Sequence, residues 1–569
     1  MPRQFFRLLA AFALALLITS CRKSGSSTSS ASGSNAAADA PEPGENAIEL
    51  LFTFGSEKEE WVKAVTADFN RSKLKTASGK TIFVRGVPKG SGELIDGLVE
   101  GTDQAHVASP ASAAFIGVGN AKWRAKTGQD LIGPTENLVL SPVVIAMWQP
   151  MAEALGWGKQ PVGWADILAL SADPQGWASK GFPQWGSFKF AHTHPEFSNS
   201  GLISLFAEVY AATGKTAGLT LEDVAKPETA RFLGSIERSV VHYGSSTGFF
   251  GKKMFANGPS YVSAAVLYEN MVIEAAANKD SMAFPVVAIY PKEGTFWSDH
   301  PAGIVNREWV TPEHREAAKQ YLAYLLARPQ QQRAMEFGFR PALADLPLAA
   351  PIDVAHGVNP REPQTTLEVP QPQVMDAITR LWRENKKHSH ITLVMDVSGS
   401  MNENQRMQNA RIGGQELVKL LGDGDSFRLL PFNERVFPSK PAAVLKGSRP
   451  QAMAEIGSLI ANGGTALYDA ISTAYRDQLA SATQNRDKIS AIVVLTDGAD
   501  THSSIQLERL LNEIRSDNET KTIRVFTIGY DAGGQSDVLK KIADATQAKF
   551  YEGNPKNIRE VFKDISTFF

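Results

Sequence analysis

Runs of apolar residues divide the chain into short buried strands, most of them followed by helices with one apolar face. In the first half, strand patterns occur at 48–54, 81–87, 105–108, 138–147 and 284–290. Helical periodicity, in which apolar residues recur every three or four positions, occurs at 59–69, at 94–99 and after Ser200. Strands that alternate with helices in this way predict an α/β fold with doubly wound lobes.

The last third of the chain shows the same alternation. Buried strands are expected at 391–396, 427–432, 489–496 and 523–528, with helices between them and a final helix at 555–568. An amphipathic helix at 374–384 leads into this region. Six prolines between positions 347 and 372 precede that helix, and they predict a stiff spacer or a strap packed on the first domain.

Oxygen-bearing side chains gather where two strands of the last third end. Each of these strands ends in an aspartate, and between them a Gly-Gly turn opens a helix with a threonine. Open α/β sheets place their ligands at the carboxyl ends of the strands. The candidate metal ligands are Asp396, Ser398, Ser400, Thr465 and Asp497. Carboxylates and hydroxyls are hard donors, which suit Mg²⁺ or Ca²⁺ and do not suit zinc or copper.

These segments resemble the von Willebrand factor A (VWA) family with its metal-ion-dependent adhesion site. The matching residues are Asp396-Val397-Ser398-Gly399-Ser400, Gly464-Thr465 and Thr496-Asp497-Gly498. The resemblance implies a doubly wound (Rossmann-like) domain that holds Mg²⁺, Ca²⁺ or Mn²⁺ and binds rather than catalyses. It also implies that a carboxylate of a protein partner completes the metal shell. Ordinary turns or helix caps are the alternative for Asp-x-Ser-x-Ser alone, and the three segments together favour the metal.

Two loops in the first half place small polar residues at predicted helix starts. Ser198-Asn199-Ser200-Gly201 precedes one helix, and Gly90-Ser91-Gly92 precedes another. A helix start offers N–H groups and the positive end of the helix dipole to an anion. Plain N-capping explains each loop alone, so only the two together, in facing lobes, favour a cleft. The candidates for a solute site are Ser91, Ser198, Asn199 and Ser200, with Ser56, Ser109 and Ser112 as weaker ones.

Short segments of this half resemble the type 2 periplasmic solute-binding proteins, the class that holds phosphate, sulfate and molybdate binders. These segments are 108–112, 141–146, 194–201 and 338–341. The resemblance implies two α/β lobes joined by two crossings, with a small solute between them. An oxyanion, a small organic carboxylate and a peptide all remain open. A domain that has lost its ligand and serves as a scaffold is the rival interpretation.

The N-terminus has the layout of a bacterial lipoprotein signal. Arg3 and Arg7 precede an apolar stretch at 8–18, and Ile18-Thr19-Ser20-Cys21 resembles a lipobox. Cys21 is the only cysteine of the chain, and acyl chains on it would anchor the protein to a membrane of the cell envelope, on its periplasmic or extracellular side. An ordinary secretory signal with an incidental cysteine is the alternative.

Length and composition set the remaining expectations. A chain of 569 residues is too long for one core. The predicted organisation is a signal peptide at 1–20, a flexible Ser/Gly/Ala tether at 21–46, a solute-binding-protein-like domain at 47–345, a Pro-rich linker with its lead-in helix at 346–387 and a VWA domain at 388–569. The net charge of −2, without a basic stripe, gives no indication of a nucleic-acid partner. No organic cofactor is expected.

One motif is typical of an enzyme. Gly244-Ser245-Ser246-Thr247-Gly248 fits the Gly-x-Ser-x-Gly pattern of serine hydrolases, and His242 lies nearby. That pattern needs a strand before it and a helix after it. The sequence predicts a helix at 228–241 and no convincing helix start at 249–251, so a loop that lines the cleft is favoured over a nucleophilic Ser246. His192 and His194 resemble a zinc pair, but no third ligand accompanies them at metal spacing.

Overall fold

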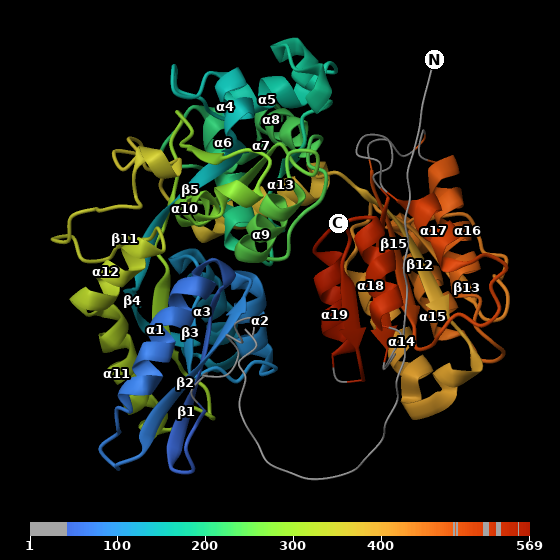
Figure 1. Ribbon diagram of the computed structural model, residues 1–569, viewed down its shortest axis with the longest axis horizontal. Coiled ribbons are helices and arrows are strands. Elements are labelled where there is room, and N and C mark those ends of the chain that lie inside the picture. Colours follow the sequence, from blue (N-terminus) through green and yellow to red (C-terminus); the bar gives the residue numbers. More distant parts are fainter. Residues whose placement is uncertain (1–41, 482–483, 485–487, 516–522, 531–535, 556) are drawn as a thin grey trace, which may run out of the picture. The chain divides into compact units, whose positions relative to one another are not determined.

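Helices and strands alternate along the chain as the sequence predicts (Figure 1). The computed structural model describes residues 42–481, 484, 488–515, 523–530, 536–555 and 557–569. Cys21, the signal segment and most of the tether lie outside the described residues. In the described part of the chain, no helix combines the length and the apolar character needed to cross a membrane.

The first lobe is built on a five-stranded sheet in the order β2-β1-β3-β10-β4. Its strands are β1 (Ala47–Gly55), β2 (Thr81–Lys89), β3 (Val107–Ser109), β4 (Ile132–Asn137) and β10 (Pro301–Val305). The first three are parallel, whereas β10 is antiparallel to both of its neighbours. The lobe's helices are α1 (Glu59–Ser72), α2 (Ser91–Glu100), α3 (Ala113–Thr127), α11 (Pro312–Leu326) and α12 (Arg328–Glu336).

The second lobe is built around β5 (Val139–Trp148), an almost wholly buried strand. Its sheet runs β11-β5-β7-β6, and β8 and β9 also pair with β5. These strands are β6 (Phe190–Ala191), β7 (Ala264–Tyr268), β8 (Val286–Ile289), β9 (Trp297–Ser298) and β11 (Arg340–Pro341). The helices are α4 (Gln149–Leu155), α5 (Trp164–Ala172), α6 (Asn199–Thr213), α7 (Leu221–Ala225), α8 (Pro227–Glu237), α9 (Thr247–Asn257) and α10 (Glu269–Ala277).

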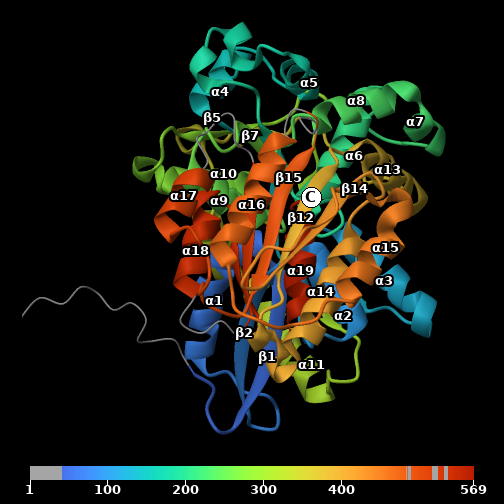
Figure 2. The same ribbon diagram turned by 90° about the vertical axis from the view of Figure 1, so that its right-hand side faces the viewer.

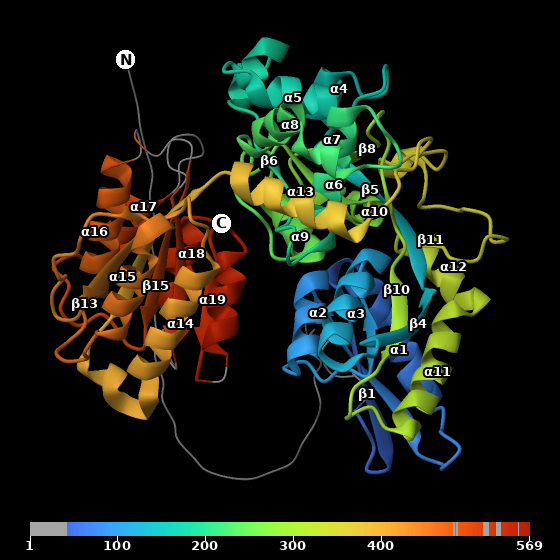
Figure 3. The ribbon, with the colours of Figure 1, turned by 180° about the vertical axis from the view of Figure 1, so that it is seen from behind.

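The chain passes between the two lobes at adjacent points (Figure 3). β4 continues into β5 through Leu138, and β9 continues into β10 through Asp299 and His300. The amide N–H of Leu138 donates to the carbonyl oxygen of His300 at 3.1 Å, which ties these crossings together. The sequence predicts two crossings, and the structure adds a third from α12, which packs on α1, to β11, which pairs with β5.

The Pro-rich segment packs on the second lobe as a strap. Ile352, Val358 and Leu367 are buried, and Thr366 forms a β-bridge with Thr295. The chain then enters α13 (Pro372–Asn385), which packs against α6, α7 and α8 (Figure 3).

The last region is a six-stranded sheet in the order β14-β13-β12-β15-β16-β17. The parallel strands are β12 (Ser389–Asp396), β13 (Ser426–Phe432), β15 (Ile489–Thr496), β16 (Arg524–Tyr530) and β17 (Phe550–Gly553), and the edge strand β14 (Ala443–Val444) is antiparallel. One face packs on α14 (Arg406–Leu420), α15 (Leu445–Gly457) and α19 (Ile558–Ser566), and the other on α16 (Leu467–Ala480), α17 (Leu507–Ile514) and α18 (Ser536–Ala545) (Figure 2). The predicted doubly wound fold is confirmed.

Candidate functional site

The five predicted metal ligands lie at the carboxyl edge of the last sheet. Asp396 is the final residue of β12, and Asp497 directly follows β15. The Ser400 hydroxyl donates to Asp497 Oδ1 at 2.8 Å and lies 3.1 Å from Ser398 Oγ. A Cβ atom added at Gly498 would lie 4.0 Å from both Ser400 Oγ and Thr465 Oγ1, so the threonine hydroxyl approaches the same place. The three loops therefore bring five hard oxygen donors together.

Asp396 is the most enclosed member of this group. Its side chain accepts hydrogen bonds from the Ser398 N–H at 2.7 Å and from Thr496 Oγ1 at 2.5 Å. Burial raises the pKa of Asp396 to about 6. A carboxylate that is costly to ionise inside the protein gains most from a nearby cation. The donor set and the buried Asp396 therefore both fit a hard divalent ion.

Arg406, which the sequence analysis did not include, faces the same carboxylates. Arg406 is the first residue of α14, and its Nη1 lies 2.9 Å from Asp497 Oδ2. The guanidinium balances the charge of Asp497, so the two aspartates of the site do not face each other uncompensated. No sequence signal indicates the pair, since the two residues lie 91 positions apart in the chain.

The predicted solute residues lie where helices from both lobes begin. The two helices chosen from the sequence, α2 and α6, are joined there by α3 and α9, which start after Ser112 and Ser246. The Ser112 hydroxyl donates to Asn199 Oδ1 at 2.6 Å, and Ser198 Oγ lies 3.1 Å from Thr247 Oγ1. Four helix N-termini, two from each lobe, therefore converge on one place.

N-capping does not account for these hydroxyls. Ser112, Ser198 and Ser246 occupy the N-cap positions of their helices, yet none of them makes a side-chain capping hydrogen bond. Ser91 Oγ accepts from the Ala111 N–H at 3.0 Å, and Ser200 Oγ lies 2.8 Å from Thr193 Oγ1. These serine hydroxyls hydrogen-bond to other segments and do not cap their helices. At α2 the cap is made instead by the Glu93 carboxylate, which accepts from the Gly90 N–H at 3.3 Å.

The two lobes touch directly at this place. The Ser56 hydroxyl donates to Ser246 Oγ at 2.9 Å, and the Gly248 N–H donates to Ser56 Oγ at 3.0 Å. The Gly92 N–H donates to the Phe197 carbonyl oxygen at 2.8 Å. Ser56 and Gly92 belong to the first lobe and their partners to the second, so the structure has its lobes closed on each other.

Charged side chains near the hinge neutralise one another. Lys58 is fully buried, with its Nζ 2.8 Å from Glu57 Oε1 and 3.1 Å from His300 Nδ1. Burial opposes the ionisation of Glu57, yet Lys58 and His300 lower its pKa to about 2. The positive charge of Lys58 is thus balanced by Glu57, so it leaves little net charge to attract an anion.

Ser246 is not arranged as a nucleophile. The helix α9 begins at Thr247, so the expectation of no helix after the Gly-x-Ser-x-Gly motif is wrong. The segment before the motif contributes only isolated β-bridges at Val240 and Gly244 and not a strand. Among the described residues, no hydrogen bond joins Ser246 to His242, whose Nδ1 lies 3.0 Å from the Tyr243 carbonyl oxygen. Burial lowers the pKa of His242 well below its usual range.

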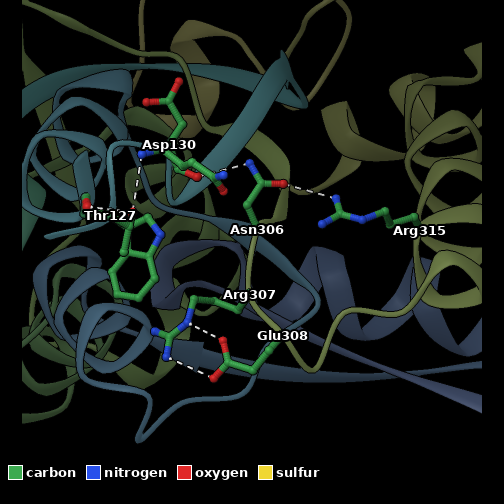
Figure 4. Close-up of a pocket in the computed structure, with 8 residues that line it drawn as sticks. Thr127, Asp130, Asn306, Arg307, Glu308 and Arg315 are labelled. Atoms are coloured by element: carbon green, nitrogen blue, oxygen red, sulfur yellow. Dashed lines mark hydrogen bonds and ion pairs between the residues drawn. The ribbon is translucent and has the colours of Figure 1, made fainter.

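An open groove of about 640 Å³ on the first lobe lies apart from both sites (Figure 4). Its Arg307 pairs with Glu308, and its Arg315 donates to Asn306 Oδ1 at 3.1 Å. The Arg307 guanidinium also lies 4.3 Å from the centre of the Trp123 ring. The polar groups of this groove therefore bind each other.

Two family models match this chain. Residues 390–564 match the von Willebrand factor type A domain, and residues 127–358 match a bacterial extracellular solute-binding protein. The chain joins a bacterial solute-binding domain to a VWA domain. The resemblances to these two families that the sequence analysis describes are therefore confirmed.

The individual proteins that this chain resembles share less than a quarter of its residues in the aligned region. Two Mycobacterium tuberculosis proteins, from strains CDC 1551 and H37Rv and both described as uncharacterized, are 23% identical to this chain over 433 residues. These residues cover 72% of this chain and 60% of each relative, so the chain spans less than two thirds of their length.

Each of two solved structures is similar to only one part of this chain. A von Willebrand factor type A protein from Catenulispora acidiphila is 24% identical over 32% of this chain and 42% of its own, with a TM-score of 0.29. The sulfate-binding protein SubI from Mycobacterium tuberculosis H37Rv is 17% identical over 53% of this chain and 88% of its own, with a TM-score of 0.36.

Proposed function

We propose that this protein binds a small anion between the lobes of its solute-binding domain and a protein partner through a divalent metal in its VWA domain. The convergence of four helix N-termini carries the first half of the proposal. Each helix start places the positive end of its dipole at the same point, which favours an anion. Proteins of both families generally lack enzymatic activity, and we propose that this chain is a binder too.

One buried hydroxyl, three residues before Ser112, supports an anion that accepts hydrogen bonds. Ser109, at the end of β3, is fully buried, and its Oγ has no hydrogen-bond partner among the described residues. An unsatisfied buried hydroxyl costs free energy, which a ligand oxygen would recover. The chemistry fits an oxyanion, a small organic carboxylate or the carboxylate end of a peptide.

The metal site supports the second half of the proposal. Asp396, Ser398, Ser400, Thr465 and Asp497 would hold Mg²⁺, Ca²⁺ or Mn²⁺. The ion would offer an open coordination position to a carboxylate of the partner.

A thermal-shift series should distinguish the solute proposal from the scaffold alternative. The compounds to test are phosphate, sulfate, molybdate, amino acids and short peptides. A solute that touches both lobes should raise the melting temperature of the full chain by mass action. The Ser91→Ala/Ser200→Ala double variant should lose most of that shift, because it removes one hydroxyl from each lobe. A thermal-shift series measures both proteins. If none of these compounds shifts the wild type, or the double variant shifts equally, the scaffold interpretation replaces the proposal.

We also propose that Cys21 is lipidated and holds the protein at a membrane of the cell envelope. Solute-binding proteins of this family are extracellular, which agrees with a periplasmic or extracellular location. Cys21→Ala should release the chain into the soluble envelope fraction or leave it unprocessed. Fractionation followed by mass spectrometry of the N-terminus measures this. A processed variant that stays with the membrane would contradict lipid anchoring at this residue.

A further inference from the structure

We propose that the second lobe holds a structural transition-metal ion of the Zn²⁺ class, bound by His192, Glu208 and Glu237. This site is separate from the VWA metal site and independent of the proposed function. His192 follows β6, Glu208 lies within α6, and Glu237 ends α8. One ligand atom from each residue lies within 4.8 Å of the other two, and all three residues are fully buried. One imidazole and two carboxylates form a ligand set that suits Zn²⁺.

The sequence gives the pair His192 and His194 no third ligand, and the structure places the two rings against different neighbours. The ring of His194 packs against Trp382, with 5.0 Å between ring centres. His192 instead meets carboxylates from two helices. Residues distant in sequence supply the missing ligands, so no local spacing could indicate them.

The outer atoms of the three ligands are held by other groups. His192 Nδ1 lies 2.8 Å from the Thr193 carbonyl oxygen, so this nitrogen carries the proton and Nε2 faces the cluster. Ser204 donates to Glu208 Oε1 at 2.9 Å, and Tyr243 donates to Glu237 Oε2 at 2.7 Å. Such outer hydrogen bonds fix the orientation of ligands in metal sites.

The remaining ligand atoms, His192 Nε2, Glu237 Oε1 and Glu208 Oε2, face one another at the centre of the cluster. His192 Nε2 and Glu237 Oε1 lie 2.9 Å apart. Glu208 Oε2 is buried and has no hydrogen-bond partner among the described residues. A protonated imidazole would satisfy Glu237 but would leave this oxygen unpaired. A cation at the centre accounts for all three atoms.

Charge balance also favours a divalent ion. Glu208 and Glu237 are both fully buried, so two bare carboxylates side by side are costly here. A proton on Glu208 would remove its charge, yet the new O–H would still need an acceptor. A divalent ion beside a neutral imidazole balances both carboxylates.

The position of the cluster indicates what the ion would do. Trp382, on α13, donates its indole N–H to Glu237 Oε2 at 3.2 Å. The ion would therefore join α6 and α8 and would hold the helix that leads into the VWA domain. Since the ligands are fully buried, the metal would enter during folding and stay bound.

Metal analysis of the full chain tests this proposal, with Asp396→Asn as the background so that the VWA site contributes no metal. The protein is unfolded with chelator, refolded with Zn²⁺, passed over a desalting column and measured by plasma mass spectrometry. About one zinc per chain is expected, as in structural sites. Adding Glu208→Gln should remove most of it. Adding Glu228→Gln, an exposed glutamate on α8, should leave it unchanged.

Stability provides the second measurement. The refolded background protein should melt at a lower temperature without zinc, whereas the Glu208→Gln protein should melt at the same temperature with and without it. A background protein that refolds without retaining zinc overturns the proposal, and so does Glu208→Gln protein that retains as much zinc. If Glu208→Gln fails to fold, the metal content of the background protein alone decides the question.

Discussion

Replacing Asp396 with asparagine should weaken divalent-cation binding by the VWA domain by at least about 100-fold, since even outer-shell changes at metal sites cost 10–100-fold. The substitution removes the negative charge of the most buried member of the site and keeps its shape. The asparagine oxygen can still accept from the Ser398 N–H, so the loop should keep its conformation. Calorimetric titration of the full chain with Mn²⁺ measures the loss.

A control variant should change the charge near the site without changing a ligand. Glu403 lies in the same loop region, with a side chain that is 69% exposed. Glu403→Gln removes one negative charge without touching a proposed ligand, so it should leave the affinity within about twofold, because exposed charges interact weakly through water. Equal Mn²⁺ affinity in wild type and Asp396→Asn would refute the ligand assignment.

Arg406 restricts which oxygen of Asp497 a metal can use, and the sequence does not predict this restriction. Asp497 Oδ2 faces the guanidinium, while Asp497 Oδ1 accepts from Ser400. A metal that used Oδ2 would have to displace Arg406, whereas one that used Oδ1 would need only a rotation of the Ser400 hydroxyl. The apo site is therefore less repulsive than two bare aspartates, and removing Asp396 should give little gain in stability.

Local patterns predicted most of the elements because each buried strand is a continuous apolar run. The strand expected at 138–147 is β5, which is buried almost throughout. The antiparallel placement of β10 inside the first sheet was not predictable, because it depends on a strand that returns from the second lobe. The start of α9 was missed because Gly248 and Gly251 lower the helix propensity of its first turns.

The two candidate sites differ in how many of their residues the sequence predicts. The metal ligands form short motifs at strand ends, so their spacing was enough to group them. Two helix starts predict the cleft from the sequence. The other two are missed because Ser112 is only a weaker candidate and because the sequence predicts a cleft-lining loop, and no helix start, after Ser246. Only the structure shows that Ser112 meets Asn199 and that Ser246 meets Ser56.

Gly248→Ala should hold the two lobes of the solute-binding domain apart. A Cβ atom at this position would lie 2.5 Å from the carbonyl carbon and oxygen of Ser56 and 2.8 Å from the Glu57 nitrogen. These are backbone atoms of the first lobe, which cannot rotate away as a side chain would. Alanine suits the helical position of residue 248 itself, so the strain falls on the contact between the lobes.

Distances between spin labels measure the opening. The only native cysteine is Cys21, so Lys126→Cys and Lys180→Cys, at exposed positions in the first and second lobes, can be labelled specifically in a Cys21→Ser background. Gly248→Ala should lengthen the mean distance between the labels and weaken any anion-dependent thermal shift. Gly117→Ala is the matched control, because a Cβ atom there meets nothing within 4 Å. Identical distance distributions in the two variants would show that the contact of Gly248 with Ser56 does not control closure.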